Sequence, residues 1–194
     1  MQTLLQLLAK QPHSAKELMQ SLQLSQPSVS RLLKTHNNII KIGKARATQY
    51  ALQRPIRNMG YQWPVYRIDE QAHIALAGQL IAVYPHGFVW HDALTDANTL
   101  YEGLPWFLWD IRPQGFLGRE FKQIHLQLGL PERLPDWQDD DVLVFLLKFG
   151  FVQPSHFIVG DDSRLALNRL QKDVWQPAED DGLAQTRALY GQEA

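Results

Sequence analysis

The sequence predicts an α+β fold, for three reasons. Leucines at helical spacing fill the first 35 residues, and runs of β-branched and aromatic residues follow up to about residue 90. Helical patterns return after residue 103. The hydrophobic fraction of 45% and the charged fraction of 20% are ordinary for a soluble globular protein.

Charge divides the chain into two parts. Residues 1–57 contain nine basic side chains and one acid, Glu17, a balance of +8. Residues 58–194 contain ten basic and nineteen acidic side chains, a balance of −9. Such asymmetry indicates that nucleic acid or another anionic surface is the partner of the basic part. We therefore expect a basic domain over residues 1–57, an acidic domain over residues 61–170 and a polar tail over residues 171–194.

The first two helices follow from leucine spacing and from capping residues. Thr3–Gln11 places its leucines at helical spacing, and Pro12 ends this helix. Ser14 and Glu17 are typical of a capping box, in which the hydroxyl and the carboxylate satisfy free amides at a helix start. The second helix is expected to end at about Leu22.

A third helix and a hairpin complete the basic part. Ser25 is expected to cap a helix that runs to Lys34. Pro27 is tolerated in its first turn because no backbone hydrogen bond is lost there. Residues 39–52 are typical of two strands around a turn at Gly43. A helix-turn-helix followed by a hairpin forms a winged helix-turn-helix, whose second helix enters the major groove of double-stranded DNA.

The exposed side of the third helix and the hairpin tip carry the candidate DNA contacts. These candidates are Gln26, Ser28, Ser30, Arg31, Lys34, Lys44 and Arg46. We expect Gln26, Ser28 and Arg31 to read base edges and the other two helix residues to contact phosphates. The two hairpin residues would reach phosphates or a minor groove. The alternative, an ordinary solvated helix face, is disfavoured because cap, turn, hairpin and charge agree.

The acidic part is expected to begin with a small antiparallel sheet and to continue with helices. β-Branched and aromatic residues between glycines and prolines favour strands at residues 63–69, 74–84 and 88–90. Helices are expected at residues 105–111, 116–128 and 142–149.

Two stretches resemble known families. LSQPSVSR at residues 24–31 resembles the start of the recognition helix in winged helix-turn-helix domains of bacterial regulators. LPWFLWDIRPQGFLGR at residues 104–119 is similar to the N-terminal subdomain of HipA-type serine/threonine kinases, the toxins of a bacterial toxin–antitoxin class. The similarity extends through residues 137–143 and 157–161. It points to the YjjJ (HipH)-like subgroup, whose kinase carries its own N-terminal helix-turn-helix, and implies a HipA N-terminal-like domain.

The sequence lacks the parts that phosphoryl transfer needs. It contains no Gly-rich loop leading into a helix, no HRD-like stretch and no DFG- or DFD-like triplet. The chain is therefore not expected to be an enzyme by itself. Two interpretations stay open: a regulator that acts in trans with a separate HipA-like kinase, or the N-terminal fragment of a one-piece kinase, acting in cis.

Other groups with possible chemistry have simpler explanations. The three aspartates at residues 139–141 precede an apolar helix and would stabilise its positive end. Asp161 and Asp162 suit a turn. His86 and His91 would face opposite sides of an extended segment without an obvious third ligand, so no metal and no cofactor is expected.

Aromatic and arginine side chains near residues 105–119 favour packing or a protein interface. Base stacking is disfavoured because the surrounding domain is acidic, and the arginines would pair with carboxylates of a partner or of the chain itself. The residues are Trp106, Phe107, Trp109, Phe116, Arg112 and Arg119.

These observations predict a sequence-specific transcriptional regulator of the toxin–antitoxin type. It would bind double-stranded DNA as a homodimer, because helix-turn-helix motifs usually occupy two half-sites. A cytoplasmic location without a membrane partner is expected, because no apolar run approaches the ~20 residues of a membrane span, cysteine is absent and no secretory signal is visible. The remaining alternative is an interaction module whose winged helix binds protein.

Overall fold

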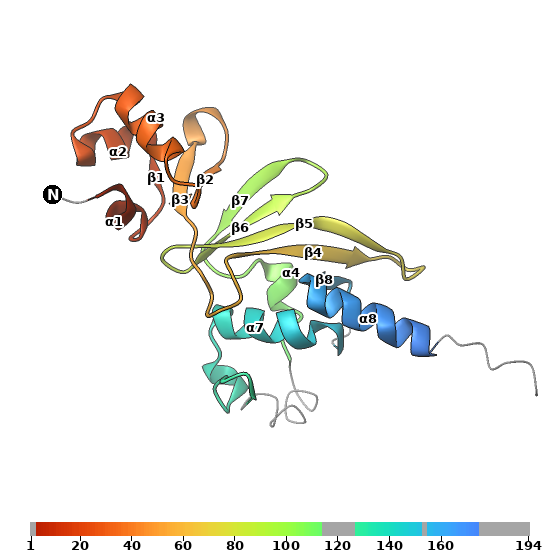
Figure 1. Cartoon of the computed structure of the whole chain (residues 1–194). Coiled ribbons are helices and arrows are strands. Elements are labelled where there is room, and N and C mark those ends of the chain that lie inside the picture. Colours follow the sequence, from red (N-terminus) through yellow and green to blue (C-terminus); the bar gives the residue numbers. More distant parts are fainter. Residues whose placement is uncertain (1–2, 114–126, 153–154, 175–194) are drawn as a thin grey trace, which may run out of the picture.

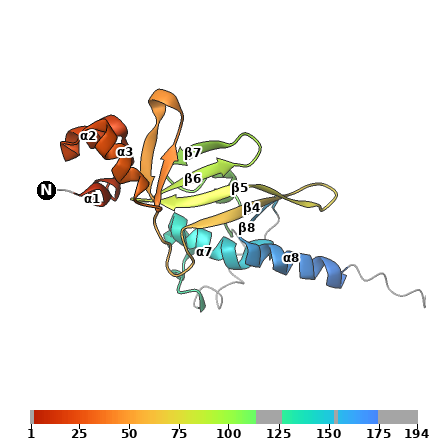
Figure 2. The same cartoon turned by 45° about the horizontal axis from the view of Figure 1, so that its top comes forward.

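The computed structural model describes residues 3–113, 127–152 and 155–174, which form two connected units (Figures 1 and 2). In the first unit, here called the winged helix, three helices pack on an antiparallel sheet of order β1-β3-β2. The helices are α1 (Leu4–Leu8), α2 (Ala15–Leu22) and α3 (Gln26–Lys34), and the strands are β1 (His13–Ser14), β2 (Ile39–Ile42) and β3 (Gln49–Leu52).

Capping residues set where these helices begin. The predicted capping box is confirmed: the Ser14 hydroxyl accepts from the Glu17 amide, and the Glu17 carboxylate accepts from the Ser14 amide at 2.7 Å. Ser25 occupies the N-cap position of α3, but its hydroxyl pairs with that of Ser28 at 2.9 Å and caps no amide. The prediction of a capping side chain at Ser25 is therefore wrong, because the Ser28 hydroxyl in the first turn of the helix takes up the Ser25 hydroxyl.

The hairpin turn depends on Gly43. Its φ of +73° lies in the left-handed region, and a Cβ at this position would lie 2.6 Å from the carbonyl oxygen of Ala47. A short 3-10 helix, Ala45–Ala47, then leads into β3. The predicted glycine-containing turn between two strands is confirmed.

The second unit, here called the sheet unit, is a five-stranded antiparallel sheet with helices against one face. The strand order is β7-β6-β5-β4-β8. The strands are β4 (Gln62–Ile68), β5 (Ile74–Val83), β6 (Gly87–Asp92), β7 (Ala97–Tyr101) and β8 (Phe157–Val159), and the helices are α4 (Trp106–Trp109), α7 (Asp139–Phe149) and α8 (Asp161–Val174). Short 3-10 helices lie at Leu134–Asp136 and Gly150–Val152. The predicted α+β fold class is confirmed.

The main core lies between this sheet and α7. Val65, Leu80 and Phe88 of the sheet are fully buried against Leu143 and Phe145 of α7. Figure 1 shows α7 and α8 along this face of the sheet. The continuous apolar run of α7 is explained by this position, because most of its circumference is covered.

The opposite face of the same sheet packs on the hairpin of the winged helix. Successive side chains of β5 and β6 point to opposite faces of the sheet. On the face away from α7, Ile81, Val83 and Val89 therefore form a separate buried cluster with Ile42 and Ala51 of the hairpin. In both views the hairpin lies between the helices of the winged helix and the sheet (Figures 1 and 2). The hairpin is therefore the middle layer of the molecule.

The C-terminal part differs from the expectation. Asp161 and Asp162, expected in a turn, open the helix α8, and β8 extends the sheet by pairing with β4. The helix expected over residues 116–128 lies almost entirely outside the described residues, as does the tail from residue 175. Within the described ranges, no helix is both long and apolar enough to cross a membrane.

Candidate DNA-binding interface

Helix α3 has one buried side and one exposed side. Val29 and Leu33 are buried against the other helices. The side chains of Gln26, Ser30, Arg31 and Lys34 are exposed. The exposed side therefore presents an amide, a hydroxyl and two cations. These groups can donate hydrogen bonds to base edges and phosphates.

Ser28 is placed differently from the other candidate residues of α3. It is half-buried, and its hydroxyl lies 2.9 Å from that of Ser25. One of its hydrogen-bonding directions is therefore used inside the protein, which leaves it a smaller capacity for a base contact than Gln26 or Arg31.

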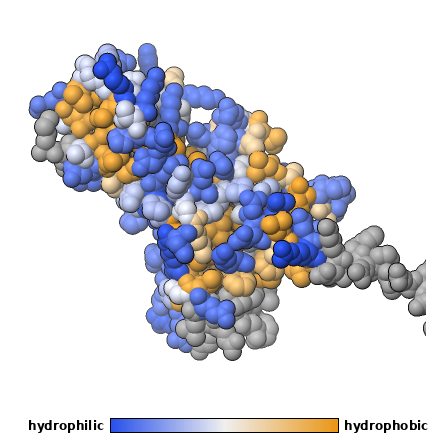
Figure 3. Space-filling model, in the orientation of Figure 1, coloured by the Kyte–Doolittle hydropathy of each residue, from blue (hydrophilic) through white to orange (hydrophobic). Residues whose placement is uncertain are grey.

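The hairpin adds two further cations beside this helix. Lys44 and Arg46 are exposed at the turn between β2 and β3, where the chain reverses through Gly43. Figure 3 shows hydrophilic side chains over α3 and the hairpin at this end of the molecule. The structure thus brings the helix candidates and the hairpin candidates onto one end of the winged helix.

A groove between α3 and the hairpin contains residues that the sequence analysis missed. The residues are His36, Asn37, Lys41 and Tyr50, and they line the groove together with Ser30 and Lys34. Lys41 was missed because its relation to α3 depends on how the hairpin packs, which local spacing does not reveal. The available signal was the break in an apolar strand, where one lysine interrupts three isoleucines.

Most cations of the winged helix have no carboxylate partner within the described ranges. These cations are Lys10, Lys16, Arg31, Lys34, Lys41, Lys44 and Arg46. Arg54 and Arg57, also counted in the basic part, instead pair with Asp140 and Asp141 of the sheet unit, each with an N–O distance of 2.8 Å. When these two paired arginines are left out, the winged helix has seven cations and one acid, Glu17. Its net charge available to a partner is therefore +6, rather than the +8 counted from the sequence.

Glu17 is the one acid of the winged helix, and its charge is used internally. The Ser14 amide and hydroxyl both donate to its carboxylate, which lowers the pKa of Glu17 below its ordinary value. The carboxylate therefore stays charged as a helix cap, and within the described ranges it forms no ion pair with the exposed cations of α3 and the hairpin.

The three aspartates at the start of α7 have structural partners. Asp139 accepts a hydrogen bond from the Leu104 amide at 2.9 Å, and Asp140 and Asp141 hold the two arginines described above. Asp141 also forms a capping box with Gln138, in keeping with the expected role at the positive helix end. In the part of the chain that the structure describes, no three His, Cys, Asp or Glu residues are grouped to hold a metal ion.

His91 pairs with a residue that makes a polar contact between the units, whereas His86 lies in the exposed β5–β6 turn. The Nδ1 atom of His91 lies 2.9 Å from the amide oxygen of Asn98, and the amide nitrogen of Asn98 donates to the Lys41 carbonyl at 3.1 Å. The sheet unit therefore contacts β2 directly beside the groove.

The aromatic stretch after residue 104 divides between core and surface. Trp106 is 70% exposed, whereas Phe107 packs against the main core. The Arg112 guanidinium stacks over the Trp109 ring, 4.2 Å from its centre. Outside the described residues lie Phe116 and Arg119.

Comparison with known families assigns a class to each unit. Residues 3–35 match the arsR family of bacterial regulatory proteins, and residues 59–168 match the middle domain of YjjJ-like toxins. The second match covers more than half of the chain, so the chain belongs to the YjjJ-like toxin family. The resemblance inferred from residues 104–119 is confirmed.

A curated relative supports the same family. Toxin YjjJ of Escherichia coli (strain K12) is 38% identical over 162 residues, which are 83% of this chain and 36% of that protein. The chain therefore spans about a third of the length of the relative that it matches. No solved structure matches the chain.

Proposed function

We propose that this chain is a sequence-specific DNA-binding regulator of the toxin–antitoxin type. The observation that carries the proposal is the exposed face of α3, where amide, hydroxyl and cationic side chains have no carboxylate partner among the described residues. In this proposal Gln26, Ser28 and Arg31 read bases. Backbone phosphates are contacted by Ser30, Lys34, Lys44 and Arg46.

The oligomer and the kinase belong to the same proposal. A homodimer would place two copies of α3 on two half-sites of the operator. The chain itself would transfer no phosphoryl group and would act together with a HipA-like kinase. The YjjJ-like middle domain, residues 59–168, supports this association with a toxin.

A second candidate is that the chain is the DNA-binding and regulatory portion of a one-piece HipA-like kinase. It is favoured by the extent of the match, because about two thirds of the E. coli relative has no counterpart in this chain. The intact mass of the protein captured from its source cells distinguishes the two. A mass near 22.3 kDa supports the regulator in trans, and a much larger mass supports the one-piece kinase.

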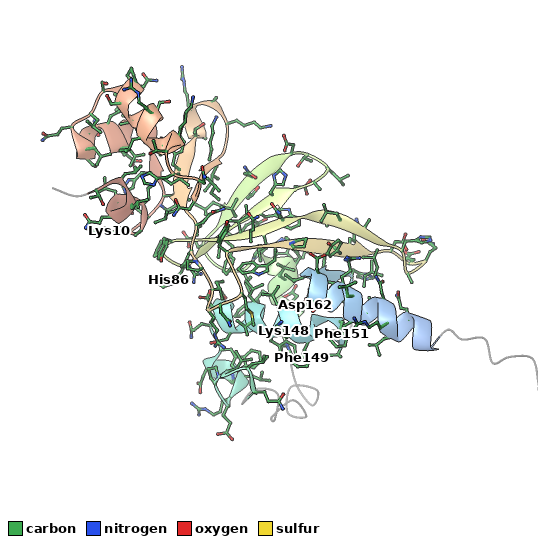
Figure 4. All side chains as sticks on the ribbon, viewed as in Figure 1. Lys10, His86, Lys148, Phe149, Phe151 and Asp162 are labelled. Atoms are coloured by element: carbon green, nitrogen blue, oxygen red, sulfur yellow. The ribbon has the colours of Figure 1, made fainter. Side chains whose placement is uncertain are left out.

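The DNA-binding role is tested by selecting a preferred duplex from random sequences and measuring Arg31→Ala on it. The substitution is expected to cost about 1–3 kcal/mol on the preferred duplex and less on random DNA, because a base contact is specific. Lys148→Ala is the control, since Lys148 is bound to Asp162 on the helical side of the sheet (Figure 4). An equal loss on both duplexes for Arg31→Ala would contradict base reading, and the absence of any binding at low salt would contradict the proposed function.

A further inference from the structure

The groove between α3 and the hairpin has a one-sided chemistry. It has a volume of about 400 Å³, and its polar lining residues are Ser30, Lys34, His36, Asn37, Lys41 and Tyr50. Each of these side chains can donate a hydrogen bond, two are cations, and no lining residue is a carboxylate. Such a groove is suited to a ligand that brings negative charge and several acceptor atoms.

Strand geometry explains why Lys41 faces this groove. Ile40 and Ile42 lie on the side of β2 that packs on the sheet unit, so Lys41, between them, lies on the side of the helices. Tyr50 is directly opposite Lys41 on β3. The Asn98 amide holds the Lys41 carbonyl from the other side. The backbone that carries Lys41 is therefore fixed before any ligand arrives, which lowers the entropy lost on binding.

The position of the groove identifies the source of the anion. Ser30 and Lys34 belong both to the exposed face of α3 and to the groove lining. A duplex that places its major groove on α3 would therefore bring one flanking strand over the groove. The chemistry fits a phosphodiester, whose free oxygens accept from ammonium, hydroxyl and amide donors.

We propose that the groove holds one backbone phosphate of double-stranded DNA between Lys34 of α3 and Lys41 of β2, with the Tyr50 hydroxyl as a neutral donor. This inference rests on the proposed function, because α3 is what brings the duplex to this place. The contact contributes affinity on any sequence and sets the register of α3 in the major groove, while base selection stays with Gln26, Ser28 and Arg31.

The first test is the salt dependence of binding by Lys41→Ala, measured between about 50 and 200 mM salt. The slope of log K against log salt is expected to fall by about one unit, and affinity for preferred and random duplexes to fall by the same factor. Lys41→Arg should retain the slope. Lys148→Ala is the matched control and should leave the slope unchanged, since Lys148 is bound to Asp162 and is not a lining residue of the groove, whereas Lys10, which follows α1, belongs to the basic unit itself (Figure 4). Lys41 is exposed, so thermal unfolding should be unchanged.

The second test uses a series of duplexes that each carry one uncharged methylphosphonate. The parent protein should lose affinity at the phosphate that occupies the groove, and Lys41→Ala should show no further loss at that one position. An unchanged salt slope, or additive losses at every position, would overturn the groove proposal while leaving DNA binding intact. Failure of the parent protein to bind any duplex would overturn the proposed function and this inference together.

Discussion

Seven lysines and arginines of the winged helix have no carboxylate partner among the described residues, whereas the aspartates of the sheet unit are largely engaged. Asp140 and Asp141 form ion pairs with Arg54 and Arg57 of the connecting segment, residues 53–61, and Asp162 forms one with Lys148. Unpaired like charges repel one another within a small unit, and a polyanion relieves that repulsion. Among the described residues, charge therefore forms internal ion pairs in the sheet unit and is left available to the proposed DNA partner in the winged helix.

The two units also meet through a layer that belongs to both. The winged-helix hairpin buries Leu52 against the helices and Ile42 against the sheet. The connecting segment is fixed as well, because Arg54 donates through two nitrogens to Asp140. The boundary proposed near residue 57 therefore separates two charge regions that share buried contacts.

The largest expected effect is that of Ile42→Ala, which tests whether this layer couples the units. Ile42 is 5% exposed, so truncation should lower the free energy of unfolding by about 2–4 kcal/mol through lost burial and a cavity. Denaturant unfolding should be followed by circular dichroism, which reports on both units, and by tryptophan fluorescence, which reports on the sheet unit because all tryptophans follow residue 62. If the layer couples the units, both signals should shift together as one transition.

Leu94→Ala is the matched control for this substitution. Leu94 is 92% exposed, so its truncation should change the free energy of unfolding by less than about 0.5 kcal/mol. If Ile42→Ala altered the circular dichroism transition and left the tryptophan transition in place, the winged helix would unfold by itself and the coupling would be refuted.

The second effect compares two arginines with opposite expected uses. Arg54 is buried, and Arg54→Ala leaves Asp140 without its partner, which should cost about 2–3 kcal/mol of unfolding free energy. Arg46→Ala should change stability by less than about 0.5 kcal/mol, because Arg46 is exposed and pairs with no described carboxylate. In a DNA-binding assay at equal folded fraction, Arg46→Ala should lower the affinity and Arg54→Ala should leave it unchanged. Similar stability losses for both would erase the contrast between structural and available charge.

Sequence reasoning captured the elements whose causes are local. The capping box at Ser14, the glycine turn at Gly43 and the apolar helix after residue 138 each follow from neighbouring residues. Strand β8 was missed because it has only three residues and is defined by pairing with β4, which is far away in the sequence. Helix α8 was missed because its polar composition hides one buried turn around Ser163.

The candidate interface was predictable to the same extent. Helical period places Arg31 and Lys34 opposite Val29 and Leu33, and the structure has them on the exposed side. Lys41 escaped notice because the two covered faces of β2 become apparent only when the sheet unit is packed on it. Apolar residues on both faces of a short hairpin are the sequence signal of such a second layer.

The smallest expected effect concerns Glu17, the single acid of the winged helix. Hydrogen bonds from Ser14 lower its pKa, so its stabilisation is fully present above the ordinary value of 4.5 and is lost as the pH falls through the lower folded-state pKa. Glu17→Gln keeps an acceptor for the Ser14 amide and removes this titration. The pH-dependent difference between parent and variant should be a few tenths of a kcal/mol, about the value of an exposed, screened charge at a helix start.

This expectation is tested by unfolding midpoints measured from pH 7 down to about pH 3, an interval that includes the ordinary carboxyl pKa. The parent protein should lose its small advantage over Glu17→Gln only below pH 4.5. Equal stability of parent and variant at every pH would contradict the expectation. It would mean that an uncharged acceptor for the Ser14 amide caps α2 as well as the Glu17 carboxylate does, so that the single acid of the winged helix contributes a hydrogen bond and no charge effect.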